Sequence, residues 1–185
     1  ALGCSKESDK AENLVLVSYK QTSLFQRDAI ISLLGPLESE YPGAAGIKEH
    51  AQYSVQIYSI TYKTTYKTET ITASGLVCLP DAGGDFPLIS FQNGTNTAHA
   101  NAPSVNPINY NYMLLEAMAS NGYVLLIPDY IGFGASADKI HPYYEKESTV
   151  QSVIDMIKAV QELVNEKSIA ANTNGTTYLM GYSQG

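Results

Sequence analysis

The end of the chain decides the fold, because a strand predicted over residues 176–180 leads directly into Gly181-Tyr182-Ser183-Gln184-Gly185. Glycines two places before and two places after a serine suit a tight, strained turn from a strand to a helix, where a Cβ atom would collide with neighbouring backbone. An ordinary glycine-rich turn is the alternative, and the strand before the motif argues against it. The sequence therefore predicts a nucleophile elbow with Ser183 at its tip.

Upstream of this turn, strands alternate with helices. Runs rich in Val, Ile, Tyr and Thr at residues 55–64 and 69–79 predict an antiparallel hairpin. The apolar pattern then predicts a strand at 86–91, a helix at 112–121, a buried strand at 123–128 and a helix at 148–164 capped by Ser148. This order predicts an α/β fold whose sheet is mostly parallel and follows an antiparallel hairpin.

The beginning of the chain is predicted to lie outside this domain. Residues 5–20 are polar and aperiodic, which favours a tether over residues 1–20, so the domain would comprise residues 21–185. Thr22 and Ser23 can cap a helix that ends at Gly35-Pro36, and residues 41–46 are rich in turn-forming residues.

The charge balance and hydropathy of the chain exclude two classes of partner. The sequence holds 11 basic and 18 acidic residues, a formal net charge of -7, so nucleic acid is not an expected partner. No run approaches the roughly 20 consecutive apolar residues that a transmembrane helix requires. A membrane could therefore be reached only through a covalent lipid.

Cys4 is the candidate for such a lipid. It follows Ala1-Leu2-Gly3 and precedes a charged stretch, a pattern that looks like the end of a bacterial lipoprotein signal. We therefore expect lipid attachment at Cys4 and export to the periplasm or outer membrane of a bacterium. An ordinary free cysteine near the terminus is the alternative.

Ser183 needs partners to act as a nucleophile. A serine hydroxyl is activated by a histidine that takes its proton and by an acidic residue that orients the histidine. In folds with this elbow both partners follow the serine in the chain. His50, His99 and His141 all precede Ser183, and we interpret them as loop or surface residues. The chain is therefore expected to be truncated directly after the elbow and to be inactive by itself.

A second polar loop, Gln92-Asn93-Gly94-Thr95, follows the strand predicted at 86–91. At this place the fold puts one amide of an oxyanion hole, and the N–H group of Gln184 would supply the other. Each such donor lowers the barrier by on the order of 3 kcal/mol. We predict an oxyanion hole made by Gln184 and by the loop of Asn93, Gly94 and Thr95. A plain polar turn is the alternative.

A third motif, Pro128-Asp129-Tyr130-Ile131-Gly132-Phe133-Gly134, follows the strand predicted at 123–128. Asp129 could be mistaken for the catalytic carboxylate. Because it precedes Ser183, we predict that it shapes the loop instead. The sequence shows no cluster of metal-ligating residues and no cofactor motif, so neither a metal nor a cofactor is expected.

With these motifs in this order, the sequence resembles the secretory lipase family of α/β-hydrolases, which includes lipase A-type enzymes and related bacterial lipases. The resemblance covers residues 54–185 and rests on Ser74-Gly75-Leu76-Val77 with Pro80, on Gln92-Asn93-Gly94-Thr95, on residues 128–134, on His141-Pro142-Tyr143 and on residues 181–185. It implies the α/β-hydrolase fold, hydrolysis of carboxylic esters, and a cap in the C-terminal half that sets chain-length preference. The family often has histidine where Asn93 stands, which leaves an oxyanion role for the backbone amides intact.

The predicted function is therefore a serine hydrolase that cleaves a small-molecule ester or a lipid. A peptidase or a carbohydrate acetyl esterase is the main alternative, because the elbow is common to these enzymes. A non-catalytic lipoprotein that keeps the fold for binding is a second alternative. A histidine in sequence beyond Gly185 would separate the enzymes from the binding protein.

Overall fold

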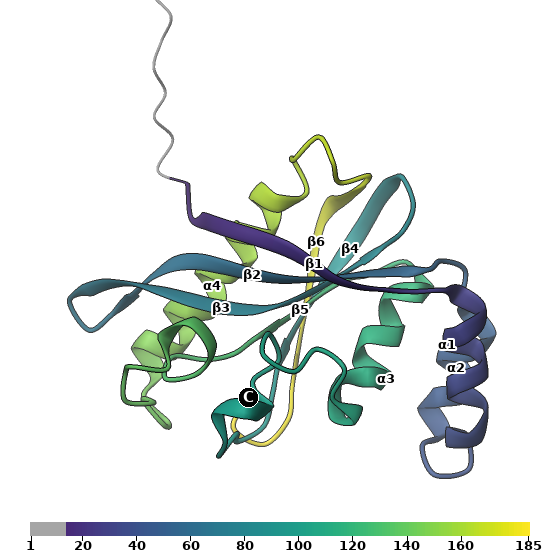
Figure 1. Ribbon diagram of the computed structural model, residues 1–185, viewed down its shortest axis with the longest axis horizontal. Coiled ribbons are helices and arrows are strands. Elements are labelled where there is room, and N and C mark those ends of the chain that lie inside the picture. Colours follow the sequence, from purple (N-terminus) through teal and green to yellow (C-terminus); the bar gives the residue numbers. More distant parts are fainter. Residues whose placement is uncertain (1–13) are drawn as a thin grey trace, which may run out of the picture.

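The computed structural model describes residues 14–185, which form one six-stranded sheet with helices on both of its faces (Figure 1). The strands are β1 (Leu16–Phe25), β2 (Val55–Tyr66), β3 (Glu69–Pro80), β4 (Gly84–Gln92), β5 (Val124–Pro128) and β6 (Ala171–Gly181). The α-helices are α1 (Arg27–Leu34), α2 (Pro42–His50), α3 (Tyr110–Met118) and α4 (Lys146–Leu163). Single turns of 3-10 helix are η1 (Gly35–Leu37), η2 (His99–Asn101), η3 (Ala119–Asn121) and η4 (Gly134–Ser136).

The sheet is mixed, with strand order β1-β2-β3-β5-β4-β6. The pairs β1/β2, β2/β3 and β3/β5 are antiparallel, and β4 pairs in parallel with both β5 and β6. The predicted α/β class and its antiparallel hairpin, now β2 and β3, are confirmed, and the parallel part of the sheet is limited to β4, β5 and β6, which is less than the mostly parallel sheet expected. Because β4, β5 and β6 run in the same direction, their carboxyl ends meet at one edge of the sheet, where α/β folds bind ligands.

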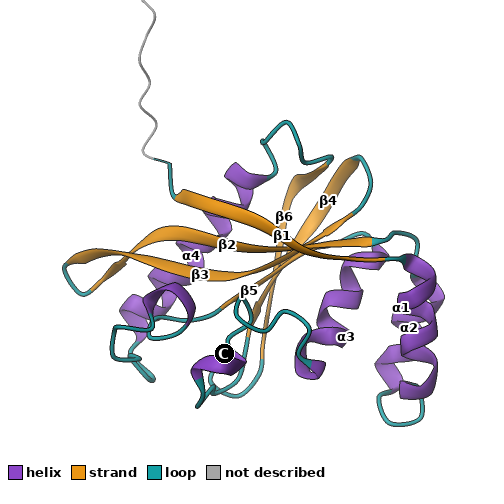
Figure 2. Cartoon of the chain, in the orientation of Figure 1, coloured by secondary structure: helices purple, strands orange, loops and turns teal. Residues whose placement is uncertain are grey.

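Two apolar cores lie on opposite faces of the sheet, and β5 divides its side chains between them. Val124 and Leu126 pack with α4, whereas Leu125 and Ile127 pack with residues of α1, α2 and α3. Figure 2 shows α1, α2 and α3 grouped at one end of the sheet and α4 crossing it at the other. All five residues of β5 are buried, as a central strand covered on both faces should be. This strand is therefore a rigid base for the loop that follows it.

The N-terminal segment differs from its prediction. Residues 16–20 belong to β1, so the tether predicted at 1–20 is wrong for them, and Leu24 and Phe25 are also in this strand rather than in a helix. Most side chains of β1 are exposed, and a polar strand that pairs through its backbone has no apolar alternation to reveal it. Glu162 of α4 fixes its start by accepting hydrogen bonds from the N–H groups of Val15 and Leu16 at 3.0 and 2.7 Å.

Two helices also begin where the sequence did not indicate. Residues 42–50, part of which was predicted as a turn, form α2, with Pro42 in its first turn. Proline is compatible with that position because the first N–H groups of a helix have no partner within it. Helix α4 is capped by Glu145 rather than by Ser148, since the Glu145 carboxylate accepts from the N–H groups of Glu147 and Ser148, each at 2.9 Å.

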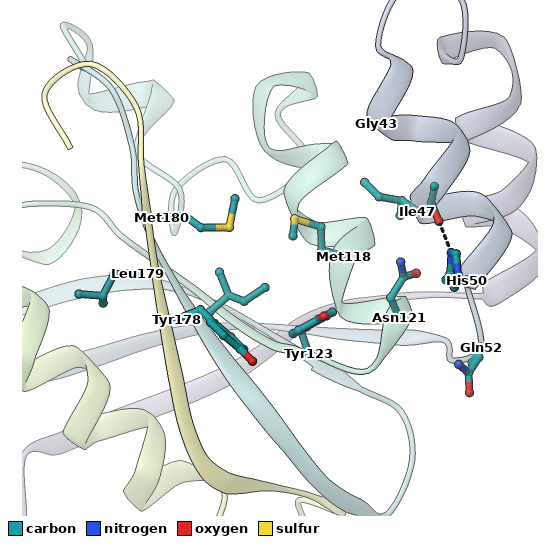
Figure 3. A pocket seen from close by; sticks show the side chains of 12 residues that line it. Gly43, Ile47, His50, Gln52, Met118, Asn121, Tyr123, Tyr178, Leu179 and Met180 are labelled. Atoms are coloured by element: carbon teal, nitrogen blue, oxygen red, sulfur yellow. Dashed lines mark hydrogen bonds between the residues drawn. The ribbon is translucent and has the colours of Figure 1, made fainter.

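Strand β6 is the edge of the sheet and is largely exposed. Its residues Tyr178 and Leu179 are 51% and 70% exposed, although both are large and apolar. A cavity of about 700 Å³ separates part of β6 from α2 and from the end of α3 (Figure 3). His50 lies in its wall and is held by the carbonyl oxygen of Gly46 at 2.9 Å. Ser183 does not line this cavity.

Candidate active site

The predicted elbow is formed at the end of β6. Ser183 has φ 57°, a left-handed conformation that is costly for a residue with a side chain. A Cβ atom on Gly181 would clash with the carbonyl oxygen of Gly185. A Cβ atom on Gly185 would clash in the same way with the carbonyl oxygen of Gln92. The two glycines are thus required by close backbone contacts. Ser183 itself is exposed at the turn.

The loop after β4 lies against this elbow. A Cβ atom placed on Gly94 would be 2.9 Å from Cδ1 of Tyr182 and 3.5 Å from Cβ of Ser183. The N–H group of Tyr182 also donates to the carbonyl oxygen of Gln92 at 3.2 Å. The structure thus brings the loop of residues 93–95 next to Ser183 and Gln184, although the two segments are about half the chain apart in sequence.

Main-chain donors remain available at this junction. Within the part of the chain that the structure describes, the N–H groups of Gly94, Thr95 and Gln184 donate to no other group. Asn93 is buried, and its side chain turns inward, where Nδ2 donates to the carbonyl oxygen of Pro128 at 2.7 Å. The Asn93 side chain therefore supports the loop, and the free backbone amides are the groups that can bind an oxyanion.

Asp129 stabilises the neighbouring loop. Its buried carboxylate accepts from the N–H group of Ser104 at 2.8 Å and from the hydroxyls of Ser74 and Ser104. Burial raises the pKa of this carboxyl, and the hydrogen bonds from Ser104 and Ser74 oppose that rise. The hydroxyl of Ser74 in turn accepts from the N–H group of Ala135 at 2.7 Å. Asp129 thus joins β3, the end of β5 and η4, and among residues 14–185 its carboxylate makes no hydrogen bond to Ser183.

Tyr130 links the loop after β5 to the loop after β4. It has φ 65°, is buried, and donates from its hydroxyl to the carbonyl oxygen of Asn93 at 3.0 Å. Burial raises the pKa of Tyr130, which keeps the hydroxyl protonated and able to donate.

Among residues 14–185, none of the three histidines hydrogen-bonds to Ser183. His50 lies on α2, and His99 is exposed with its ring against Phe133, the centroids 5.4 Å apart. His141 is half-buried and contacts the elbow, since its Nε2 lies 3.0 Å from Nε2 of Gln184. The sequence interpretation of His141 as a loop or surface residue missed this contact, and its place in the motif His141-Pro142-Tyr143 was the available signal.

Comparison with known proteins agrees with this geometry. Residues 98–185 match the model of the secretory lipase family. The resemblance to the secretory lipases is confirmed. A Legionella pneumophila protein assigned as a hydrolase is 32% identical, with a TM-score of 0.79 over 92% of this chain and 44% of its own. The comparison with curated protein sequences found no match to this chain.

Further solved structures share the fold of these lipases. The ligand-bound rice cell wall degrading esterase LipA from Xanthomonas oryzae is 29% identical, with a TM-score of 0.75 over 92% of this chain and 42% of its own. Candida antarctica lipase A, at 17% identity and a TM-score of 0.56, shows a likeness of fold alone. The chain thus has the α/β-hydrolase fold, and it spans less than half the length of the structures that it matches.

Two hollows flank the elbow of this lipase-like chain. One, of about 590 Å³, is lined by residues 93–97 together with Tyr41, Tyr112 and Tyr182. The other, of about 500 Å³, lies between α4 and the elbow and includes Gln184 and Gly185 in its wall. The residues on either side of Ser183 line these spaces, Tyr182 the first and Gln184 the second, whereas Ser183 itself lines neither.

Two of the remaining predictions concern metals and membranes. Among residues 14–185, no group of three or more His, Cys, Asp and Glu side chains is placed to hold a metal ion. No helix in the same range combines the length and the apolar character needed to cross a bilayer. Cys4 lies outside the described residues, and Cys78 is a buried free thiol in β3.

Proposed function

We propose that Ser183 is the nucleophile of a lipase or esterase that cleaves carboxylic esters. The observation that carries the proposal is the elbow itself, with Ser183 at φ 57° and the loop of Gly94 packed against it. Strained backbone at an exposed serine is costly, and such strain is concentrated at functional sites. The similarity to an esterase and to the secretory lipase family supports ester hydrolysis.

In the proposed reaction, Oγ of Ser183 attacks the ester carbonyl carbon and loses its proton to a histidine. The carbonyl oxygen becomes an oxyanion, which the N–H groups of Gln184 and of the Asn93 to Thr95 loop stabilise. The histidine then gives the proton to the leaving alcohol, and the acyl group remains on Ser183. Water, activated by the same histidine, releases the acid and restores the serine.

The histidine and its acidic partner are proposed to follow Gly185 in the complete protein, by which we mean the polypeptide that contains residues 1–185 and such a continuation. Three observations support this. None of the three histidines present bonds to Ser183, and the matched structures are more than twice as long as the matched segment. The exposed apolar side chains Tyr178 and Leu179 on β6 also leave room for further packing. Residues 1–185 alone are therefore proposed to be inactive.

The substrate is proposed to be a small-molecule ester or a lipid, and the chemistry requires no cofactor. Both hollows beside the elbow mix apolar and polar lining residues, which suits an ester with an apolar and a polar part. Export is proposed from the secretory lipase match, with lipid attachment at Cys4 as the route to a membrane. The chain from β1 onward would then be the N-terminal part of the hydrolase domain.

The deciding experiment compares hydrolysis of a p-nitrophenyl ester series, from acetyl to long acyl chains, by the complete protein and by residues 1–185. We expect turnover by the complete protein only, with a loss in kcat of at least about 10⁴-fold for Ser183→Ala. Ser32→Ala is the matched control, since Ser32 is exposed on α1 and bonds only to the carbonyl oxygen of Asp28. Undiminished turnover by Ser183→Ala would rule out the proposal, and silence of the complete protein on every ester would favour a peptidase or a binding protein.

A further inference from the structure

His141 uses both nitrogens of its ring. Nδ1 lies 2.7 Å from the carbonyl oxygen of Ile131, and Nε2 lies 3.0 Å from Nε2 of the Gln184 side chain. A carbonyl oxygen only accepts, so Nδ1 carries the hydrogen. In the neutral ring Nε2 then has a lone pair, and the amide NH₂ of Gln184 donates to it. Gln184 directly follows the nucleophile, so this bond reaches the residue that is proposed to supply one oxyanion donor.

The ring is held in place from several sides. It stacks on Tyr130 with centroids 6.2 Å apart and an interplanar angle of 24°, and Phe133 meets it edge-on at 5.1 Å. Tyr143 packs on it at 5.9 Å. A Cβ atom on Gly132, which has φ 94°, would lie 2.7 Å from the backbone nitrogen of His141, so glycine is needed for this close approach. The ring is thus seated by the loop after the fully buried strand β5.

The elbow, in contrast, has few supports of its own. Ser183 is exposed and strained, and its side chain bonds to nothing among residues 14–185. The amide oxygen of Gln184 is buried and also lacks a partner in this part of the chain, so the bond to His141 is what holds the Gln184 side chain. Fixing a side chain restricts the rotation of its own backbone, and therefore of the N–H group that must point at the oxyanion.

We propose that His141, as the neutral Nδ1–H tautomer, is a positioning residue for the oxyanion hole. It accepts a hydrogen bond from the Gln184 side chain and thereby holds the Gln184 main-chain N–H group in place for the reaction. This inference rests on the proposed ester hydrolysis, and it adds a role for a histidine that is not the general base.

The kinetic test uses the complete protein with p-nitrophenyl butyrate. His141→Leu is expected to lower kcat about tenfold while KM stays within about twofold, because a misplaced oxyanion donor weakens the transition state more than the ground state. His141→Gln can place an amide oxygen near the position of Nε2, and it is expected to recover most of kcat. His99→Leu is the control, since His99 contacts the same Phe133 ring but is exposed and bonds to no part of the elbow.

A double variant separates positioning from folding. Gln184→Leu keeps the backbone N–H group and removes the same hydrogen bond from its other side, so it tests the contact even if His141→Leu fails to fold. His141→Leu and Gln184→Leu are expected to cause similar losses, and combining them should add little. Losses that multiply in the double variant, or a His141→Gln variant as slow as His141→Leu, would overturn the proposal.

A spectroscopic test does not depend on turnover. In protein labelled with ¹⁵N-histidine, the ring nitrogens of His141, assigned by comparison with His141→Gln, are expected to show a protonated Nδ1 and an unprotonated Nε2 at neutral pH. A ring protonated at Nε2 instead would overturn the proposal. An Nδ1–H ring in a complete protein that hydrolyses no ester would mean that the contact exists but that the proposed function, and the positioning role with it, is wrong.

Discussion

The loops after β5 and β6 leave the sheet at the same edge, and each contains a residue other than glycine with a positive φ angle. Tyr130 has φ 65° and Ser183 has φ 57°. Tyr130 is buried, bonded through its hydroxyl and stacked on His141, whereas Ser183 is exposed and its hydroxyl has no partner within residues 14–185. The strain in the first loop is supported by packing. In the second it presents a side chain to solvent, which is what a nucleophile requires.

The strands that precede these two loops differ in burial, as the loops themselves do. Every residue of β5 is buried, while most residues of β6 are exposed. The loop after β5 therefore begins at a rigid, buried strand. The elbow after β6 is instead held by contacts with its neighbours, namely the Gly94 loop and His141. The comparison indicates that changes in the β5 loop should cost folding stability and that changes beside the elbow should cost activity.

The largest effect is expected at Asp129, which lies at the centre of the β5 loop. Asp129→Ala leaves the N–H group of Ser104 and the hydroxyls of Ser74 and Ser104 without their acceptor. Loss of a buried network of this size should lower the free energy of unfolding by about 4 kcal/mol. Urea unfolding of the complete protein and of the variant measures this difference in the free energy of unfolding. Asp138→Ala, at an exposed carboxylate paired only with Lys139, is the control, and equal stability of the two variants would contradict the support that we assign to Asp129.

A second buried carboxyl group, that of Glu116, can be compared with Asp129 because it lacks hydrogen-bond partners within residues 14–185. Glu116 on α3 is 1% exposed, neither of its carboxyl oxygens has a partner within residues 14–185, and burial raises its pKa from 4.5 to about 8. A raised pKa means that the folded state holds the proton more tightly than the unfolded state. The stabilisation that comes from protonated Glu116 is therefore fully present below pH 4.5 and is lost as the pH rises toward 8.

Between pH 5 and pH 7 the ionisation of this group should reduce the free energy of unfolding by about 2.5 kcal/mol. Glu116→Gln cannot ionise, so its stability relative to the parent should increase by about that amount over the same interval. Unfolding by urea at pH 5 and at pH 7 measures the difference. Glu147→Gln, on the exposed first turn of α4, is the control. A stability difference between parent and Glu116→Gln that does not change with pH would show that Glu116 is not buried in this way.

The parts of the fold that the sequence predicted are those with a local signal. The hairpin of β2 and β3, the buried strand β5 and the helix α4 have apolar patterns of the correct period, and the elbow has glycines at a fixed spacing. Strand β1 lacks such a pattern, because its place in the sheet depends on backbone pairing with β2, about 40 residues later in the chain. The glycines in α2 similarly suggested a turn, whereas packing against α1 makes that segment helical.

In the candidate site, too, the residues that could be predicted are those with a local signal in the sequence. Ser183, Gln184 and the Gly94 loop could be predicted because each stands directly after a predicted strand and the topology brings the ends of those strands together. The contact of His141 could not be predicted, because the motif His141-Pro142-Tyr143 draws attention to the residue but does not indicate that its ring lies against Gln184. That contact depends on how the β5 loop folds back, which is a property of Gly132 and of the aromatic residues around it.

The smallest effect is expected for Gly94→Ala, on the elbow side of the comparison. The added methyl group would lie 2.9 Å from the Tyr182 ring and 3.5 Å from Cβ of Ser183, so the loop or the ring must shift by a fraction of an ångström. Tyr182 is 71% exposed, and its ring can move without disturbing the core. We therefore expect kcat/KM to fall about tenfold, or about 1.4 kcal/mol, while the free energy of unfolding changes by less than about 0.5 kcal/mol.

Steady-state kinetics and urea unfolding of the same preparation separate these two effects. Gly43→Ala is the matched control, because Gly43 is exposed on α2 and a Cβ atom there would meet nothing within 4 Å. If Gly94→Ala unfolded as readily as Asp129→Ala, the β4 loop would belong to the supported framework. The rigid part of the site would then include the β4 loop as well as the β5 loop, and only Ser183, the proposed nucleophile, would have no structural role.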